Sequence, residues 1–202
     1  MPLLDLRVWD ANCEELQNAL LNGELDIAIS TDSKVGDRLR MTKLYEERYF
    51  VSFPQGHRFE SMNAVPLKEI DGEAYIQRLH CEFPGDLAEA GIKPPYRGVD
   101  ARFHGEREDW IQMLVVSGLG IALMPEFLPI IPGLRTRPVV DPEISRPVSL
   151  LTVAGRPHTP AVAQVVKIAQ AIDWYAESAA ACASRLLIPK IFSSGSTDIL
   201  MV

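Results

Sequence analysis

The 202-residue chain has few cysteines, a deficit of positive charge and no long uninterrupted hydrophobic run. Its three cysteines, Cys13, Cys81 and Cys182, are widely spaced and form no CxxC pair, which argues against a disulfide framework or a cysteine zinc site. The 20 Lys and Arg residues are outnumbered by 27 Asp and Glu, so the net charge is −7. Such a chain is not expected to grip nucleic acid through its own surface, because that binding depends on neutralising phosphates.

Signals for secretion and for membrane insertion are also missing. Asp5 and Arg7 interrupt the early apolar run before it reaches the length of a signal-peptide core. The most apolar window, residues 115–134, is broken repeatedly by residues that end helices: Gly118, Gly120, Pro125, Pro129, Pro132 and Gly133. We therefore expect a cytoplasmic protein that makes no membrane contact.

Recognisable catalytic motifs are absent from the sequence. It contains no GxSxG elbow, no phosphate-binding glycine loop and no HExxH pair, and its four histidines are scattered at positions 57, 80, 104 and 158. The sequence therefore predicts that the chain is not an enzyme and uses no metal or cofactor.

What the sequence does contain is one design used twice: an amphipathic helix, a glycine and then a short apolar strand. The first copy ends in residues 23–29 (GELDIAI) and the second in residues 116–125 (VSGLGIALMP). An apolar run directly after a helix-ending glycine is typical of a strand buried on both faces of a parallel sheet. Two such units indicate two small α/β lobes, and a cleft between lobes is a common place for a small ligand.

Periodicity and capping residues predict the order of the elements. Asn12 and Gly23 bound an expected helix over 13–22. A second helix is expected to begin at Glu106, Glu108 and Asp109, with its inward face formed by Trp110, Ile111, Leu114 and Val115. A short helix is expected at 65–70 and a long one from Pro160 to about Tyr175. Strands are expected at 3–9, 25–29, 39–44, 48–53, 74–77, 97–103, 134–140 and 148–153.

Three stretches carry a resemblance to a known family: residues 16–29 (LQNALLNGELDIAI), 54–70 (PQGHRFESMNAVPLKEI) and 109–126 (DWIQMLVVSGLGIALMPE). With residues 146–175 they resemble, in matching order, the effector-binding domain of LysR-type transcriptional regulators. The resemblance implies a type 2 periplasmic-binding-protein-like α/β fold, whose two lobes are joined by crossover strands near 49–54 and 148–153. It assigns 1–54 and 148–178 to lobe I and 55–147 to lobe II, and leaves 179–202 as a poorly packed tail.

The chain departs from the family pattern at its beginning. Members of the family begin with a winged helix-turn-helix, a linker helix, and the first strand and helix of lobe I, whereas residues 3–9 resemble the second strand of that lobe. The resemblance therefore implies an incomplete lobe I whose central strand is missing. It also implies that DNA is a partner only through an absent N-terminal domain, that the effector is a small molecule, and that the full-length protein is a homo-oligomer.

Candidate ligand-binding residues lie on both predicted lobes. Ser30 and Thr31 follow a strand at its carboxyl end, where open α/β sheets bind ligands, although a solvated turn explains them equally well. Arg78 ends another strand and could hold a carboxylate by a two-pronged ion pair, the alternative being a surface ion pair of little energetic worth. These residue types favour a small anionic metabolite in the inter-lobe cleft.

The remaining candidates lie in the predicted lobe II. His104 and Gly105 precede a helix whose free amides would face the cleft in the family fold and could bind an anion, unless Glu106 already occupies them. His80 and Pro125 complete the predicted ligand-binding set.

Cys81 supports an alternative function. A His-Cys step like that of His80 and Cys81 occurs in peroxide-sensing members of the family, and a thiol beside an imidazole can react as a thiolate. The resolving cysteine of those sensors, nine residues on, is replaced here by Ala90. Cys81 is therefore a redox-active thiol, an inert thiol or a thiol that lines the ligand site. For the chain as a whole, a solute-binding protein of the same fold and an interaction module that pairs with full-length relatives remain as alternatives.

Overall fold

The computed structural model describes residues 5–32, 34–79, 100–176 and 199–201. The chain divides into two compact units: unit 1 is formed by Met1–Glu46 and Pro147–Val202, and unit 2 by Glu47–Arg146. The chain leaves unit 1 within strand β3 (Leu39–Pro54) and returns to it within β9 (Ser145–Val153). In the part of the chain that the structure describes, no helix is long and apolar enough to span a membrane.

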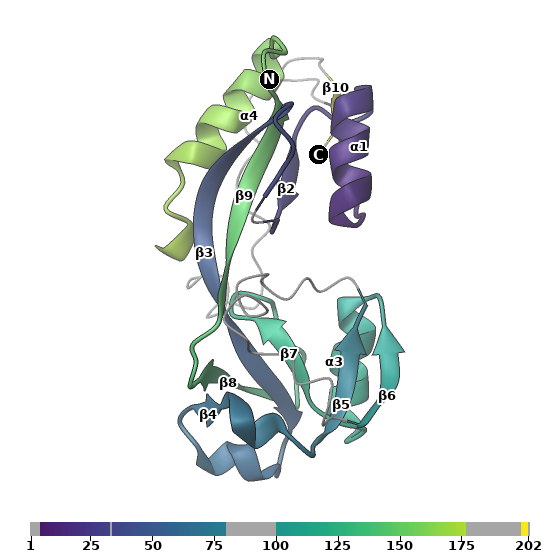
Figure 1. Ribbon diagram of the computed structural model, residues 1–202, viewed down its shortest axis with the longest axis vertical. Helices are drawn as coiled ribbons and strands as arrows, with labels where there is room; N and C mark the ends of the chain where they lie inside the picture. The colour runs from purple at the N-terminus through teal and green to yellow at the C-terminus, as the bar shows by residue number, and fades with distance from the viewer. Residues whose placement is uncertain (1–4, 33, 80–99, 177–198, 202) are drawn as a thin grey trace. The chain divides into compact units, whose positions relative to one another are not determined.

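Unit 1 consists of a small sheet with a helix on either side. Strand β2 (Ala28–Ser30) pairs antiparallel with β9, which neighbours β3, and helices α1 (Cys13–Asn22) and α4 (Pro160–Ala171) flank these strands on opposite sides (Figure 1). The α1 side is filled by a buried apolar cluster of Leu16, Ala19, Leu20, Leu25, Ala28, Leu39 and Leu151. The α4 side is closed by Ile27 and Val162.

Helix α1 begins and ends where the sequence predicts. Asn12 accepts a hydrogen bond from the backbone N–H of Glu15, and Glu15 accepts one in return from that of Asn12, so two of the unpaired amides at the helix start are satisfied. Gly23 ends the helix with φ of 81°, a left-handed conformation that costs glycine little.

The N-terminal strand of unit 1 pairs with the C-terminal part of the chain. Strand β1 (Asp5–Arg7) runs parallel to β10 (Ile199–Met201), with Asp5 opposite Ile199 and Arg7 opposite Met201. Among the described strands, β1 does not pair with β2. The edge of β1 is therefore occupied by a segment in which the sequence shows no periodic pattern.

Unit 2 is built around the second half of β3. This half pairs antiparallel with β7 (Ala122–Pro125) and β8 (Leu134–Val140), and β4 (Val65–Pro66) pairs parallel with β8. Strands β5 (Ala74–Arg78) and β6 (Asp100–Gly105) form a parallel pair, against which α3 (Glu108–Val116) packs. Two 3-10 turns, Arg58–Ser61 and Leu67–Ile70, close the core.

The structure corrects several predictions about individual elements. The expected strands at 39–44 and 48–53 form one continuous strand, because the polar residues between them stay extended where the chain passes between units. The six-stranded sheet, which holds β2 and β7, is mixed rather than parallel, and Ile29 on β2 is 41% exposed. Residues 65–70 form a strand bridge and a 3-10 turn, and α4 ends at Ala171 instead of near Tyr175.

The inward face of α3 also differs from the predicted one. Trp110 is 54% exposed, and the guanidinium of Arg107 lies over its ring, 5.1 Å from the centroid. Gln112 is buried in its place: its amide donates to the carbonyl of Pro129 at 2.9 Å and accepts from the N–H of Ile131 at 2.9 Å. Which face of α3 is buried is therefore decided by Gln112, which satisfies two backbone groups of the following loop, more than by the apolar pattern.

Candidate functional site

The carboxyl ends of β5 and β6 meet at one edge of unit 2 and bring three predicted site residues together. In this parallel pair Gln77 lies opposite His104 and Arg78 opposite Gly105, and the N–H of Leu79 donates to the carbonyl of Gly105 at 2.9 Å. Helix α3 begins just after β6, at Glu108. The edge therefore combines a cation, a histidine and the start of a helix.

Arg78 is not an isolated cation at this edge, because its guanidinium forms an ion pair with Glu108. Both side chains are largely buried, with exposures of 17% for Arg78 and 24% for Glu108. The second carboxylate oxygen of Glu108, Oε1, is buried and accepts no hydrogen bond from the residues that the structure describes. A ligand anion would have to share Arg78 with Glu108, and Oε1 is an acceptor that no described residue uses.

Desolvation raises the pKa of the Glu108 carboxyl above its ordinary value. The attraction of Arg78, its hydrogen bond and the attraction of Arg146 oppose this effect, and repulsion from Asp109 adds to it. Burial thus outweighs two nearby cations. The carboxyl at this edge takes up a proton more readily than a solvated glutamate does.

A second ion pair, which the sequence analysis missed, lies in the same unit. The guanidinium of Arg146 donates to Oε1 of Glu47 through Nη2 at 2.7 Å and Nε at 2.8 Å, with exposures of 14% and 6% for the two side chains. Arg146 also lies 5.5 Å from the ring centroid of Tyr49. Glu47 and Arg146 are the first and last residues of unit 2, and no local spacing in the sequence could have linked two residues so far apart.

The other predicted residues of unit 2 have different surroundings. His104 is exposed and Gly105 is buried, and a Cβ on Gly105 would lie 2.6 Å from Cδ1 of Ile111, so the glycine permits close packing of α3. Pro125 is buried at the end of β7, opposite Tyr49 in β3. His80 and Cys81 lie outside the described residues.

In unit 1, Ser30 is the last residue of β2 and Thr31 follows the strand, and the Ser30 hydroxyl already has local partners. Ser30 is 4% exposed; its Oγ accepts from the N–H of Asp32 at 3.1 Å and lies 3.4 Å from Sγ of Cys13. Opposite it on β9, Ser149 is 1% exposed and its Oγ is buried without a hydrogen-bond partner among the described residues. The sequence analysis missed Ser149, since a serine in an apolar strand carries no signal of its own.

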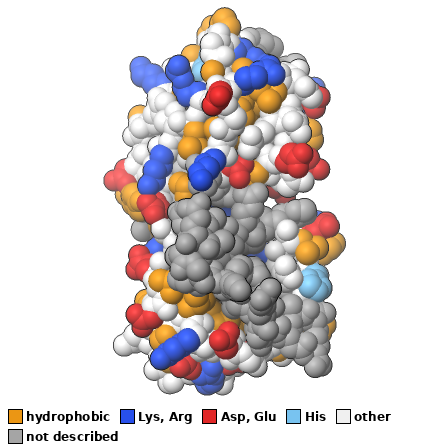
Figure 2. All heavy atoms as spheres, viewed as in Figure 1, with side chains coloured by type: hydrophobic (Ala, Val, Ile, Leu, Met, Phe, Trp, Pro, Cys, Tyr) orange, Lys and Arg blue, Asp and Glu red, His pale blue; other side chains and the backbone are white. Residues whose placement is uncertain are grey.

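Groups that could bind a metal are not assembled in the described residues, where no cluster of three or more His, Cys, Asp or Glu side chains occurs. Figure 2 shows that, on the visible face, Lys and Arg side chains are interspersed with Asp and Glu on both units. This surface pattern is in keeping with the net charge of −7.

Comparison with known proteins shows the family of the chain. A family model described as the LysR substrate binding domain matches residues 1–172. The uncharacterised HTH-type transcriptional regulator YybE of Bacillus subtilis is 28% identical over 158 residues, covering 75% of this chain and 52% of that protein. The hydrogen peroxide-inducible genes activator of Dickeya chrysanthemi is 25% identical over 167 residues, covering 77% and 52%.

Among solved structures, the oxidised form of OxyR superimposes with a TM-score of 0.68 at 20% identity, over 85% of this chain and 95% of that one. At this identity the likeness concerns the fold. The chain spans about half the length of the curated relatives it matches.

Proposed function

The chain belongs to the LysR substrate-binding domain family, and we propose that it is the effector-binding part of a transcriptional regulator that responds to a small anionic metabolite. The predicted type 2 periplasmic-binding-protein-like fold is confirmed by the family match and by the OxyR regulatory domain. The observation that carries the proposal is the match over residues 1–172. Control of DNA binding by a helix-turn-helix outside residues 1–202 is part of the proposal.

The edge formed by β5, β6 and α3 supports a ligand with two kinds of polar group. Arg78 supplies a cation for a carboxylate or phosphate, and the unpartnered Oε1 of Glu108 supplies an acceptor for a hydroxyl or ammonium group. In the paired strands, His104 lies opposite Gln77 and Gly105 lies opposite Arg78. The effector that fits this edge is an anion that also carries a hydrogen-bond donor; contacts from Ser30, Thr31, His80 and Pro125 remain predictions.

A screen of hydroxy and amino acids by thermal shift, followed by calorimetry on each hit, tests this proposal. Replacing Arg78 by Ala should weaken the binding of a carboxylate hit by roughly 1.5–3 kcal/mol, the scale of a charge-assisted hydrogen bond. Arg107→Ala is the matched control, because Arg107 is a neighbouring but exposed arginine paired with Asp109. Equal affinities for the two variants would mean that Arg78 does not bind the ligand.

The regulatory part of the proposal is tested on DNA. The isolated chain, with its net charge of −7, should show no sequence-specific shift in an electrophoretic assay. A fusion of the chain to the DNA-binding half of a relative such as the Bacillus subtilis regulator should give effector-dependent shifts. A fusion that binds its operator equally with and without the effector would contradict control by this domain.

A thiol-based redox sensor that uses Cys81 is a second candidate, favoured by the similarity to a hydrogen peroxide-inducible genes activator. Peroxide treatment followed by thiol labelling would then modify Cys81 first, and Cys81→Ser would abolish the reaction while Cys13→Ser would not. Equal reactivity of the two thiols would remove this candidate. We further propose that the protein works in the cytoplasm as a homo-oligomer and is not an enzyme; light scattering on the full-length protein tests its assembly.

A further inference from the structure

A cavity of about 350 Å³ lies within unit 1, between the sheet and α4. Its walls come from four segments: β3 contributes Arg40 and Thr42, β9 contributes Leu150 and Thr152, the loop after β9 contributes His158, and α4 contributes Val166. The volume is within the range of small-molecule sites, which starts near 300 Å³. None of the residues assigned to the proposed effector site lines this cavity.

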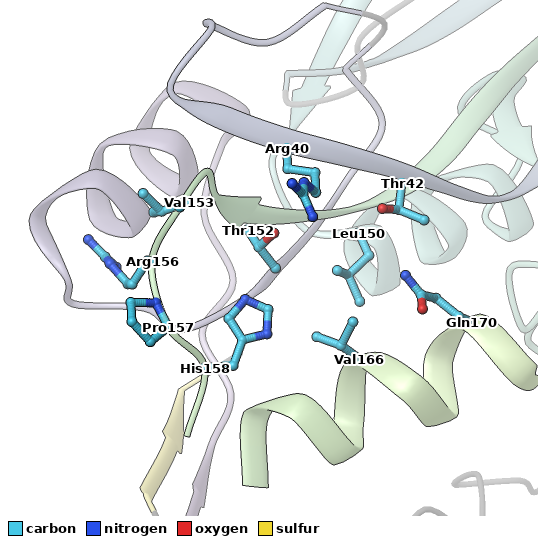
Figure 3. A pocket seen from close by; sticks show the side chains of 11 residues that line it. Arg40, Thr42, Leu150, Thr152, Val153, Arg156, Pro157, His158, Val166 and Gln170 are labelled. Carbon is cyan, nitrogen blue, oxygen red and sulfur yellow. The ribbon is translucent and has the colours of Figure 1, made fainter. Parts of the chain in front are cut away.

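The strand pattern explains why polar and apolar side chains meet in this cavity. Leu39 and Leu151 point into the buried cluster against α1, so their neighbours Arg40, Leu150 and Thr152 point to the opposite face of the sheet, toward α4. In Figure 3, Thr152 lies between Arg40 and His158, and Leu150 and Val166 lie to one side of them, on β9 and α4.

Among the described residues, the charge that lines the cavity is positive and has no acidic partner. Arg40 forms no ion pair with any described residue, and no Asp or Glu of the described chain lines the cavity. Arg156, which also borders the cavity, points away from it in Figure 3, because its guanidinium donates to the carbonyls of Leu20 at 2.9 Å and Leu21 at 3.3 Å at the end of α1. Arg40 is thus the cation that the cavity offers.

We propose that this cavity is a second ligand site that takes a small carboxylic acid with a short branched apolar body. The carboxylate lies on the guanidinium of Arg40, whose planar fork matches its two oxygens, with the hydroxyls of Thr42 and Thr152 close by. The apolar body lies on Leu150 and Val166. The site is built within one unit, so it goes beyond the proposed effector site and does not depend on it.

The test is an NMR titration of the isotope-labelled 202-residue chain with 3-methylbutanoate, its neutral isostere 3-methylbutanamide and inorganic phosphate. The acid should bind saturably and shift signals of residues that line the cavity, and the amide should bind about tenfold more weakly or worse. Arg40→Gln should lower the affinity for the acid by about tenfold or more. Val166→Phe should block binding by filling the cavity while leaving Arg40 in place.

Lys167→Gln is the matched control, since Lys167 is an exposed cation on α4 that does not line the cavity, and its loss should leave the affinity unchanged. Arg40 is exposed and forms no ion pair among the described residues, so the unliganded melting temperature of Arg40→Gln should equal that of the parent chain. Equal affinity for acid and amide, or equal losses in Arg40→Gln and Lys167→Gln, would overturn the proposal. If phosphate binds and the acid does not, the ligand is not a carboxylate. If the acid does not bind saturably, the proposal also fails.

Discussion

Replacing Arg146 by Met tests the buried ion pair at the limits of unit 2. The substitution keeps a long side chain over the ring of Tyr49 but removes both hydrogen bonds to Oε1 of Glu47. The Glu47 side chain is 6% exposed, so its carboxylate would be left without water and without a partner.

The size of the effect follows from this burial. Removing one partner of a buried ion pair costs about 3–5 kcal/mol, mostly because the remaining charge is uncompensated. In a protein of this size, 1 kcal/mol lowers the melting temperature by about 2–4 °C, so the variant should melt about 6–20 °C lower. Replacing both residues at once, by Glu47→Leu with Arg146→Met, should recover most of the loss, since an apolar pair of similar volume has no stranded charge.

Urea unfolding followed by circular dichroism measures these free energies for the parent chain, the two single variants and the double variant. Arg107→Met is the control, because Arg107 and Asp109 form an ion pair whose side chains are 62% and 55% exposed, and breaking it should leave the stability unchanged. If Arg146→Met is as stable as this control, or if the double variant shows the sum of the single losses, the carboxylate of Glu47 is not stranded and the reasoning fails.

Three further predictions rest on single sites. The pKa of Glu108 is raised, so Glu108 becomes protonated as the pH falls toward that pKa and its ion pair with Arg78 is lost. Calorimetry should therefore find that the proposed anionic effector binds more tightly at lower pH. The Glu108→Gln variant should lack this pH dependence. Gly120→Ala should destabilise the chain by about 1–3 kcal/mol in urea unfolding, because its Cβ would lie 2.5 Å from a backbone oxygen of β5, whereas Gly36→Ala, with open space around it, should not. Ser149→Ala should leave the stability unchanged or raise it by about 1 kcal/mol, since the buried hydroxyl has no partner among the described residues; a loss of more than that would reveal one.

The sequence predicted local features of the fold well where one residue decides the outcome. Asn12 and Gly23 bound α1 as expected, because a cap and a left-handed glycine act within one turn. The succession of strands along the chain was also predicted from the apolar runs. The continuous strand β3 was not, because its polar middle looks like a turn and stays extended only through partners that lie far away in the chain.

The site was readable in residue type but not in pairing. Arg78 was identified as a cation at a strand end, yet its ion pair with Glu108 depends on the parallel register of β5 and β6 and on where α3 begins. The pair of Glu47 and Arg146 joins residues at opposite ends of unit 2, and the buried Ser149 is recognisable only once its neighbours are placed. Charge compensation between distant residues has no periodic signature in one sequence.

The path of β3 and β9 between the units also determines the order in which a ribosome can complete the fold. Unit 2 is one contiguous stretch of about 100 residues and is finished first, whereas β2 must wait for its partner β9, which is made only afterwards. The paired residues of β2 and β9 lie about 120 residues apart, so at about 5–20 residues per second β2 waits roughly 6–24 s in the nascent chain for its partner strand. Nascent unit 1 is therefore the part of this protein that most needs chaperone protection during translation.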